Sequence, residues 1–238
     1  MEVDVWCVRL GGRGAASQML ADLLSATERK RAASFHAEEH RQKFAISRGV
    51  LRFLLGHYLG VEARSLEFEY AAHGKPFVAE AGIHFNVAHS GEMALFAVGG
   101  LEVGIDIEKV RPLADLMSVA GRFFSEAEAR DLASLSGEAR SRAFHHCWAR
   151  KEAYIKALGI GLSLPLESFR VSLLPGEPAG LLEIRGNPGL ELEWLITDVA
   201  APEDYAAALA VRAREIRLWT SPILEPDQLP VALYARKI

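Results

Sequence analysis

Two carboxylates stand at alternate positions of an apolar run, Val103-Gly104-Ile105-Asp106-Ile107-Glu108. Side chains alternate across a strand, so Asp106 and Glu108 would share one face, about 7 Å apart at a rise of ~3.3 Å per residue. Val103, Ile105 and Ile107 would fill the other face. Neighbouring carboxylates repel each other and lose solvation when buried, and a divalent cation with oxygen ligands would offset both costs. The pattern predicts a metal-binding strand, with a solvent-facing edge strand as the alternative.

A third acidic residue of interest lies between Phe144 and Gly159, where the composition predicts a helix that ends at a glycine C-cap. Trp148, Glu152 and Lys156 follow one another at intervals of about one helical turn. Glutamate four residues before lysine is also the favourable order for an ordinary surface ion pair. The bulky apolar residues of this segment favour instead a helix that packs into the body of the protein.

Residues that could hold a phosphate occur in four further places. Lys75 lies in the turn His73-Gly74-Lys75-Pro76, and His89 and Ser90 follow Asn86 in segment 84–91. Basic residues also gather in Arg29-Lys30-Arg31 and, as Arg41, Lys43, Arg48 and Arg52, along a helix predicted from about His40 to Leu59. The alternative in each place is a solvated surface. These residues alone do not decide between the two interpretations.

The predicted elements fall into two similar groups separated by a linker from Pro112 to about Met117. The first group has strands at 3–9, 66–70, 94–98 and 103–107, the last two paired as a hairpin, and the helix to Leu59. In the second, Ser125 as N-cap with Glu128 at the capping-box position predicts a helix to about Leu135. The helix at 144–159 and strands at 169–173, 181–184, 190–197 and 205–211 complete it.

We therefore expect an α+β fold of two similar α/β halves, residues 1–111 and 112–238. Each half would be a small, mostly antiparallel sheet packed on a long helix. Residues 212–238 contain Pro222, Pro226 and Pro230 and are expected to form a strap or tail.

Composition excludes several classes of protein. A net charge of -4 over 238 residues argues against a general nucleic-acid binder. Cys7 and Cys147 are too few for a disulfide framework or a cysteine-rich zinc site, which favours a reducing cytosol. No apolar run reaches the ~18–20 residues of a membrane span, and the N-terminus lacks the pattern of a signal peptide. We expect a soluble cytoplasmic protein that binds neither nucleic acid nor membranes.

Taken together, three segments resemble the 4′-phosphopantetheinyl transferases, from about residue 24 to 170. They are the strand with Asp106 and Glu108, Phe85-Asn86-x-x-His89-Ser90, and Trp148-x-x-Lys151-Glu152-Ala153-x-x-Lys156. Their order, with Phe123-Phe124-Ser125 between them, is similar to the long, monomeric surfactin-synthetase-activating (Sfp) type rather than the short acyl-carrier-protein-synthase type.

The resemblance implies two halves related by a pseudo-twofold, with coenzyme A bound in the cleft between them. It also implies a reaction. A serine hydroxyl of an apo acyl or peptidyl carrier protein attacks the β-phosphate of coenzyme A, accepts the 4′-phosphopantetheine arm and releases adenosine 3′,5′-bisphosphate.

The resemblance further implies a role for each matching residue. Asp106, Glu108 and Glu152 match the family's ligands for Mg²⁺, with Mn²⁺ as a substitute. Glu152 also matches the candidate general base, and Lys156 a lysine that steadies the diphosphate and the departing phosphate, so the expected catalytic residues are Glu152, Lys156 and Asp106. The residues that would contact coenzyme A are Lys30, Arg31, Arg41, Lys43, Lys75, His89, Ser90 and Lys156.

One position departs from the family pattern. A serine usually precedes the histidine, and Ala88 occupies that position here. A hydroxyl contact to a phosphate would be missing, unless Ser90 or a backbone amide replaces it.

Two other functions stay open at this point. The first is a coenzyme A-binding regulator without turnover, against which the intact Asp106, Glu108, Glu152 and Lys156 argue. The second is an unrelated metal-dependent diphosphate hydrolase, which would release phosphate or pyrophosphate without a protein acceptor. Neither the acceptor, among fatty-acid, polyketide and peptide-synthetase carriers, nor the use of acyl-coenzyme A can be read from the sequence.

Overall fold

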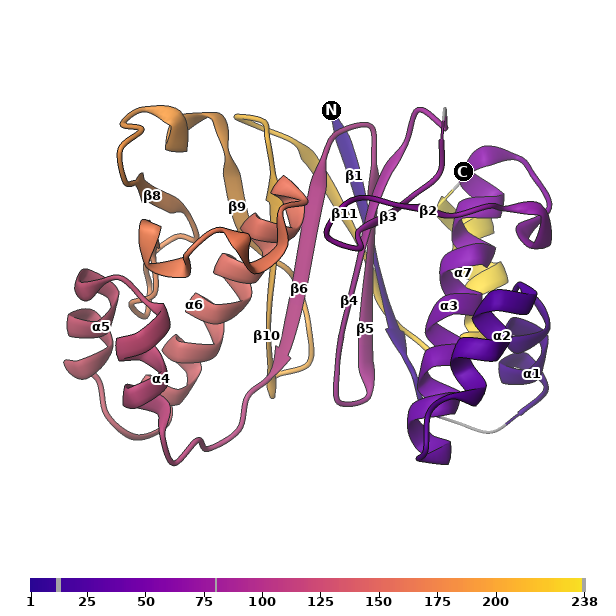
Figure 1. Cartoon of the computed structure of the whole chain (residues 1–238), viewed down its shortest axis with the longest axis horizontal. Helices are drawn as coiled ribbons and strands as arrows, with labels where there is room; N and C mark the ends of the chain where they lie inside the picture. Colours follow the sequence, from indigo (N-terminus) through magenta and orange to yellow (C-terminus); the bar gives the residue numbers. More distant parts are fainter. Residues whose placement is uncertain (12–13, 80, 237–238) are drawn as a thin grey trace.

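The computed structural model of the chain describes residues 1–11, 14–79 and 81–236. Two β-sheets pack against each other in the middle of the molecule, and helices cover the outer face of each (Figure 1). This succession of helix, sheet, sheet and helix confirms the predicted α+β class.

The first sheet has the strand order β11-β1-β5-β4. Its strands are β1 (Glu2–Arg9), β4 (His84–Ser90), β5 (Met93–Gly99) and β11 (Arg217–Leu224). All neighbouring pairs are antiparallel except β1 and β11, which run parallel. The helices on its outer side are α1 (Ala15–Asp22), α2 (Ala26–Ala33), the long α3 (Glu38–Leu59) and α7 (Leu229–Arg236) (Figure 1). Ile46, Val50 and Leu54 recur at helical spacing along α3 and bury its apolar stripe in this core.

The second sheet has the order β6-β10-β9 and is antiparallel throughout. Its strands are β6 (Val103–Lys109), β9 (Leu195–Asp198) and β10 (Tyr205–Val211). It packs on the long α6 (Gly137–Leu158), beside which lie α4 (Leu116–Phe123) and α5 (Glu126–Ala133) (Figure 1). A long helix on each sheet agrees with the predicted architecture.

Smaller elements connect these layers. Short antiparallel pairs are formed by β2 (Glu69–Tyr70) with β3 (Pro76–Phe77) and by β7 (Phe169–Val171) with β8 (Leu181–Ile184). Single turns of 3-10 helix occur at Ala63–Ser65, Gly161–Ser163, Leu166–Ser168, Leu190–Glu193 and Pro226–Gln228.

The alternation predicted for β6 is confirmed. Val103, Ile105 and Ile107 lie in the apolar core between the two sheets. Gly104 and Asp106 face α6 instead, and the missing side chain of Gly104 lets the helix approach closely. A Cβ at Gly104 would lie 2.0 Å from the Ala153 carbonyl oxygen and 2.2 Å from the Ala157 nitrogen.

The predicted hairpin of 94–98 with 103–107 is wrong. β5 pairs with β1 and β4, whereas β6 pairs with β10 in the other sheet. The tight turn lies one connection earlier, at Gly91-Glu92 between β4 and β5, and Gly91 has a φ of 58° that suits glycine. The segment 100–102 then carries the chain from one sheet to the other.

The predicted tail is also wrong. Residues 212–238 contribute the edge strand β11 of the first sheet and helix α7, whose Leu229 and Leu233 are buried in the α3 core. The predicted division at residue 111 therefore does not separate the two layers completely: β6 lies before it but belongs to the second sheet, whereas β11 and α7 lie after it but belong to the first layer. That division stays a prediction.

Helix ends follow the local sequence signals. Ser125 and Glu128 form the predicted capping box at the start of α5, and Gly159 is a left-handed C-cap of α6. The latter helix begins at Gly137, seven residues before the predicted start. Three predicted strands are shorter than expected: 66–70 reduces to Glu69–Tyr70, 169–173 reduces to Phe169–Val171, and 190–197 begins with a 3-10 turn. Among the described helices, none combines the length and apolarity that a membrane span requires.

Candidate functional site

Asp106 on β6 is buried beneath α6 and only 4% exposed. Its Oδ1 accepts a hydrogen bond from Lys156 Nζ at 2.5 Å. Its Oδ2 is buried and has no hydrogen-bond partner among the described residues. Burial raises the pKa of this carboxyl to about 7, against the charge and hydrogen bond of Lys156. One oxygen of Asp106 is therefore paired, and the other is a buried acceptor without a donor.

Glu108, two residues further along β6, is half-buried. Its Oε2 accepts a hydrogen bond of 3.1 Å from Ser90 Oγ at the end of β4. The same Ser90 oxygen accepts one of 3.1 Å from the Lys109 backbone N–H. Ser90 thus holds Glu108 where the two sheets meet.

Helix α6 supplies the third carboxylate and the lysine. Glu152 is half-buried, and burial raises its pKa, with the charge of Lys156 opposing and that of Glu108 adding. The charges of Glu108 and Glu152 likewise raise the pKa of Asp106. Three carboxylates from two elements therefore lie within electrostatic reach of one another around Lys156, as the sequence predicts.

A buried ion pair fixes the orientation of α6. Lys151 Nζ lies 2.8 Å from Glu128 Oε2, with both side chains wholly buried. Lys151 also donates to the carbonyl oxygens of Leu166 and Phe169, and Glu128 Oε1 accepts from the Val171 N–H. Lys151 therefore points away from Glu152 and anchors the far side of the helix.

The residues around Asp106 fit a hard divalent cation. Carboxylate oxygens are the donors that Mg²⁺ prefers, and the unpartnered Asp106 Oδ2 is a ligand in need of a positive partner. Within residues 1–11, 14–79 and 81–236, no group of three His, Cys, Asp or Glu side chains is arranged to hold a metal unaided. Mg²⁺ usually keeps several waters and takes one or two carboxylates plus phosphate oxygens, so a partial protein site suits it.

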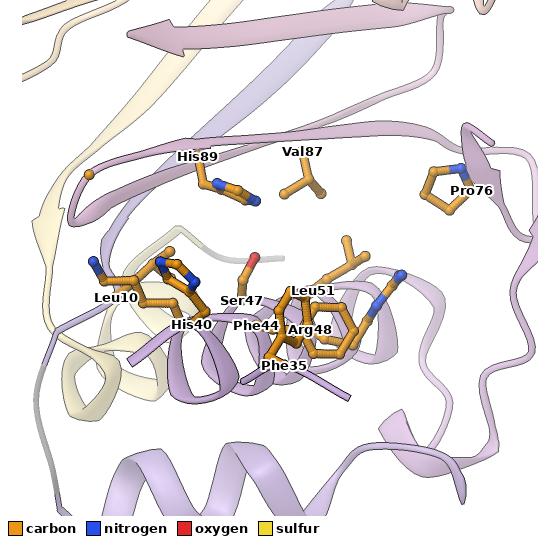
Figure 2. A pocket seen from close by; sticks show the side chains of 12 residues that line it. Leu10, Phe35, His40, Phe44, Ser47, Arg48, Leu51, Pro76, Val87 and His89 are labelled. Atoms are coloured by element: carbon orange, nitrogen blue, oxygen red, sulfur yellow. The ribbon is translucent and has the colours of Figure 1, made fainter. Parts of the chain in front are cut away.

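A cavity of about 580 Å³ lies between β4 and α3, a size typical of ligand pockets (Figure 2). His89 and Val87 of β4 point into it from one side, opposite His40, Ser47 and Arg48 (Figure 2). Partial desolvation and then the charge of Lys156 lower the pKa of His89. The imidazole of His89 therefore lines this cavity and lies within electrostatic reach of Lys156 and Glu108.

A second cavity, of about 340 Å³, lies on the other side of the β4–β5 turn. Ser90, Glu108, His145 and Trp148 are among its lining residues, and Gly91 lines both cavities. His145 Nδ1 lies 2.7 Å from the Ser141 carbonyl oxygen. Glu108 thus lines the second cavity, which meets the first at the β4–β5 turn.

The predicted coenzyme A contacts are distributed unevenly. Lys43 lines the first cavity, where it forms ion pairs with Glu39 at 2.6 Å and Glu92 at 2.5 Å. Arg41 pairs with Glu38 at 3.0 Å, and its Nε is buried without a hydrogen-bond partner among the described residues.

Lys30 and Arg31 are exposed on the neighbouring helix α2. The Arg31 guanidinium lies 5.6 Å from the ring centre of Phe44, which lines the first cavity. The Arg31 side chain is thereby held near the cavity. The roles of all four residues stay predictions.

Lys75 lies outside both cavities. Its Nζ donates to the carbonyl oxygens of Val103 at 2.9 Å and Lys156 at 2.8 Å. Burial lowers its pKa, and the charge of Glu102 opposes this. The predicted contact of Lys75 with coenzyme A is untested, but the ammonium has protein partners of its own.

Ala88 is buried in the core between the sheets, because alternation along β4 puts it on the face opposite His89. A side chain at this position cannot face the first cavity in the present arrangement. The hydroxyl that is near the carboxylates belongs to Ser90.

Among the residues by which α3 lines the first cavity, Lys43 alone was predicted to contact coenzyme A. His40, Lys43, Phe44, Ser47, Arg48 and Leu51 all line this cavity. Their spacing of i, i+3, i+4, i+7, i+8 and i+11 places them along one helical stripe, adjacent to the apolar stripe of Ile46, Val50 and Leu54. That mixed polar and aromatic stripe was the signal that could have identified them.

Comparisons with known proteins agree on one family. Residues 102–210 match a family model described as the 4′-phosphopantetheinyl transferase superfamily, and residues 14–99 match one described as 4′-phosphopantetheinyl transferase, N-terminal. The chain is 40% identical over 215 residues to the 4′-phosphopantetheinyl transferase HetI of Nostoc sp., covering 88% of this chain and 87% of that protein. It is 31% identical to the 4′-phosphopantetheinyl transferase Sfp of Bacillus subtilis, covering 66% of this chain and 70% of that protein.

Among solved structures, the holo-(acyl-carrier-protein) synthase from Bacillus anthracis in complex with CoA (3′,5′-ADP) covers 47% of this chain and 94% of that chain. The identity is 23% and the TM-score 0.37. The two family matches together include β4, the first cavity's wall on α3, and both elements that carry the carboxylates.

Proposed function

Because the chain belongs to the 4′-phosphopantetheinyl transferase superfamily, we propose that it transfers the 4′-phosphopantetheine arm of coenzyme A to a serine of an apo acyl or peptidyl carrier protein. The observation that supports this most strongly is the meeting of Asp106, Glu108, Glu152 and Lys156 beside the second cavity, which Glu108 lines. The first cavity would take the nucleotide, and the second would leave the acceptor serine a route to Glu108.

In the proposed reaction, the serine oxygen forms a bond to the β-phosphorus of coenzyme A. The bond from that phosphorus to the bridging oxygen of the diphosphate breaks, and adenosine 3′,5′-bisphosphate leaves. The serine proton passes to Glu152, directly or through one water. The raised pKa of Glu152, caused first by its burial, makes this carboxylate a better proton acceptor than an exposed glutamate.

We propose that Asp106, Glu108 and Glu152 hold Mg²⁺, or Mn²⁺ in its place, together with the diphosphate. When bound, the metal would neutralise the charge of the diphosphate oxygens. Lys156 would donate to a phosphate oxygen and stabilise the charge that develops on the leaving group. Its present partner, Asp106 Oδ1, keeps the ammonium in position beforehand.

His89 and Lys43 would bind phosphates of the nucleotide from the first cavity, and Arg41 would do so from the first turn of α3. Lys30 and Arg31 would reach the 3′-phosphate from α2. Ser90 would act mainly by orienting Glu108, which its hydroxyl contacts at 3.1 Å. Two α/β halves related by a pseudo-twofold, with coenzyme A between them, would account for a sheet and a long helix on each side. The monomeric state and the cytoplasmic location stay predictions.

The proposal is tested by measuring adenosine 3′,5′-bisphosphate released from coenzyme A by chromatography, with and without an apo carrier protein. Release should require the carrier and should vanish with a carrier whose acceptor serine is replaced by alanine. Release at the same rate without any carrier would identify a hydrolase and contradict the proposal. Binding of coenzyme A without release, across several carrier types, would identify the silent regulator instead.

A further inference from the structure

Lys75 joins two backbone segments of the site through three carbonyl oxygens. Besides the carbonyls of Val103 and Lys156, its Nζ donates to that of Ala157 at 3.4 Å. An ammonium has three N–H donors, so all three are directed at backbone oxygens. Val103 is the first residue of β6, and Lys156 and Ala157 lie in the last turn of α6.

This contact has a clear physical basis. The last carbonyls of a helix lack intrahelical partners and carry the negative end of the helix dipole, so a buried cation there is stabilised. The lysine stem passes beside the C-cap Gly159, where an added Cβ would lie 3.7 Å from Lys75 Cδ.

The turn that carries Lys75 is closed by backbone hydrogen bonds of its own. The Ala71 N–H donates to the Lys75 carbonyl at 2.9 Å, and the Gly74 N–H to the Ala71 carbonyl at 2.8 Å. The next residue, Pro76, lines the first cavity, and Arg48 of that cavity donates to Tyr70 Oη at 3.1 Å. The β2–β3 hairpin therefore contacts the first cavity on one side and the end of α6 on the other.

From these contacts we infer that Lys75 is a positioning residue for Lys156, rather than a ligand of coenzyme A. It ties the start of β6 to the end of α6, and the same two elements meet again at the pair of Asp106 with Lys156. The tie sets the position of α6 along β6, and hence the distance between the lysine ammonium and the carboxylates. This inference rests on the proposed function, since it concerns the same reaction.

The test compares Lys75→Met, Lys156→Ala and the double variant in carrier-dependent transfer, with kcat and KM for coenzyme A measured separately. Lys75→Met should lower kcat roughly tenfold, because small misplacements of catalytic groups are costly, with KM changed less than about twofold. The double variant should have the kcat of Lys156→Ala alone, since a residue acting through Lys156 has no effect once that ammonium is gone. Lys75→Arg, which keeps the cation, should restore part of the loss.

Arg140→Met is the matched control. Arg140 Nε donates to the Leu135 carbonyl just after α5, so it too is a cation beside a helix end, but remote from Asp106. Its loss should leave kcat unchanged. If Lys75→Met proves too unstable to assay, Lys75→Gln, which retains two donors, takes its place in the same cycle.

A raised KM for coenzyme A at unchanged kcat would overturn the inference and make Lys75 a ligand contact. If the loss of kcat in the double variant equals the product of the losses in the two single variants, the inference is overturned too. If the wild-type protein shows no carrier-dependent transfer, the proposed function fails. If the wild-type protein is active and Lys75→Met has the same activity, the inference about Lys75 fails and the proposed function stands.

Discussion

The ammonium of Lys156 on α6 lies 2.5 Å from Asp106 Oδ1 on β6, while Asp106 Oδ2 is buried without a partner in the described part of the chain. Both elements lie within residues 102–210, which match a single family model. One oxygen of Asp106 is therefore paired with an ammonium. The other oxygen has no donor or cation beside it among the described residues, which favours binding of a cation at this site.

Replacing Asp106 with asparagine should lower kcat by about 10²-fold or more and weaken the response of the rate to Mg²⁺. Asparagine keeps the shape and an oxygen for Lys156 but removes the charge that would bind the metal. Initial rates over a range of Mg²⁺ concentrations measure this.

Asp4→Asn is the control for that change. Asp4 is as buried as Asp106 and pairs with Arg236 and Tyr58, far along the chain from β6. The Asp4→Asn protein should be less stable than the wild type, yet its rate of transfer should keep the same dependence on Mg²⁺. An Asp106→Asn protein with normal rates and normal Mg²⁺ dependence would remove Asp106 from the metal site.

Lys156→Ala should reduce kcat more than it raises KM for coenzyme A, by about 10²-fold against a few-fold. A group that stabilises charge on the departing phosphate acts in the transition state more than in the bound substrate. Steady-state kinetics give both constants, with Arg212→Ala, which breaks an exposed pair with Glu193, as the control. A pure KM effect would give Lys156 a binding role instead.

Gly104→Ala should both destabilise the protein and impair transfer. The new Cβ would lie 2.0 Å from the Ala153 carbonyl oxygen, so β6 and α6 must separate, at a cost of about 1–3 kcal/mol. Separation would also lengthen the contact of Asp106 with Lys156. Urea unfolding and kcat should change together.

Gly121→Ala serves as the counterpart, because a Cβ there meets no atom within 4 Å and Gly121 lies within α4. Alanine should leave activity unchanged and raise helix stability by roughly 0.5–1 kcal/mol. Equal effects of the two substitutions would show that the close approach at Gly104 is unimportant.

Asp198 on β9 should contribute a pH-dependent part of the stability. Burial raises its pKa, but His146 and the hydrogen bonds of Arg150 outweigh this and hold the pKa at about 2, below the ordinary 3.8. A lowered pKa stabilises the fold above pH 3.8, and the contribution is lost as the pH falls towards 2. The difference in unfolding free energy between wild type and Asp198→Asn should therefore shrink over this range, and a constant difference would contradict the assignment.

Local patterns predicted the parts of the site that depend on one element at a time. The alternation in 103–108 correctly predicted that Asp106 and Ile105 lie on opposite faces of the strand. The spacing in α6 predicted that Glu152 and Lys156 lie on the same side of the helix. Both follow from fixed periods of 2 and 3.6 residues. Ser125 with Glu128 likewise predicted where α5 begins.

Pairings between distant segments could not be read in the same way. β6 joins β10 and β1 joins β11 across about a hundred residues or more of sequence, and no local signal marks these partners. The same limit applies to Lys75, whose position in a turn resembles that of any solvated lysine. Only its placement against Val103 and Lys156 reveals the contact.

The central claim is tested most directly by intact-protein mass spectrometry of an apo carrier protein incubated with this protein, coenzyme A and Mg²⁺. The account predicts a mass gain equal to one phosphopantetheine arm on the carrier, lost when EDTA is added and absent with Asp106→Asn. An unchanged mass across acyl and peptidyl carriers, with folded protein and intact coenzyme A, would contradict it.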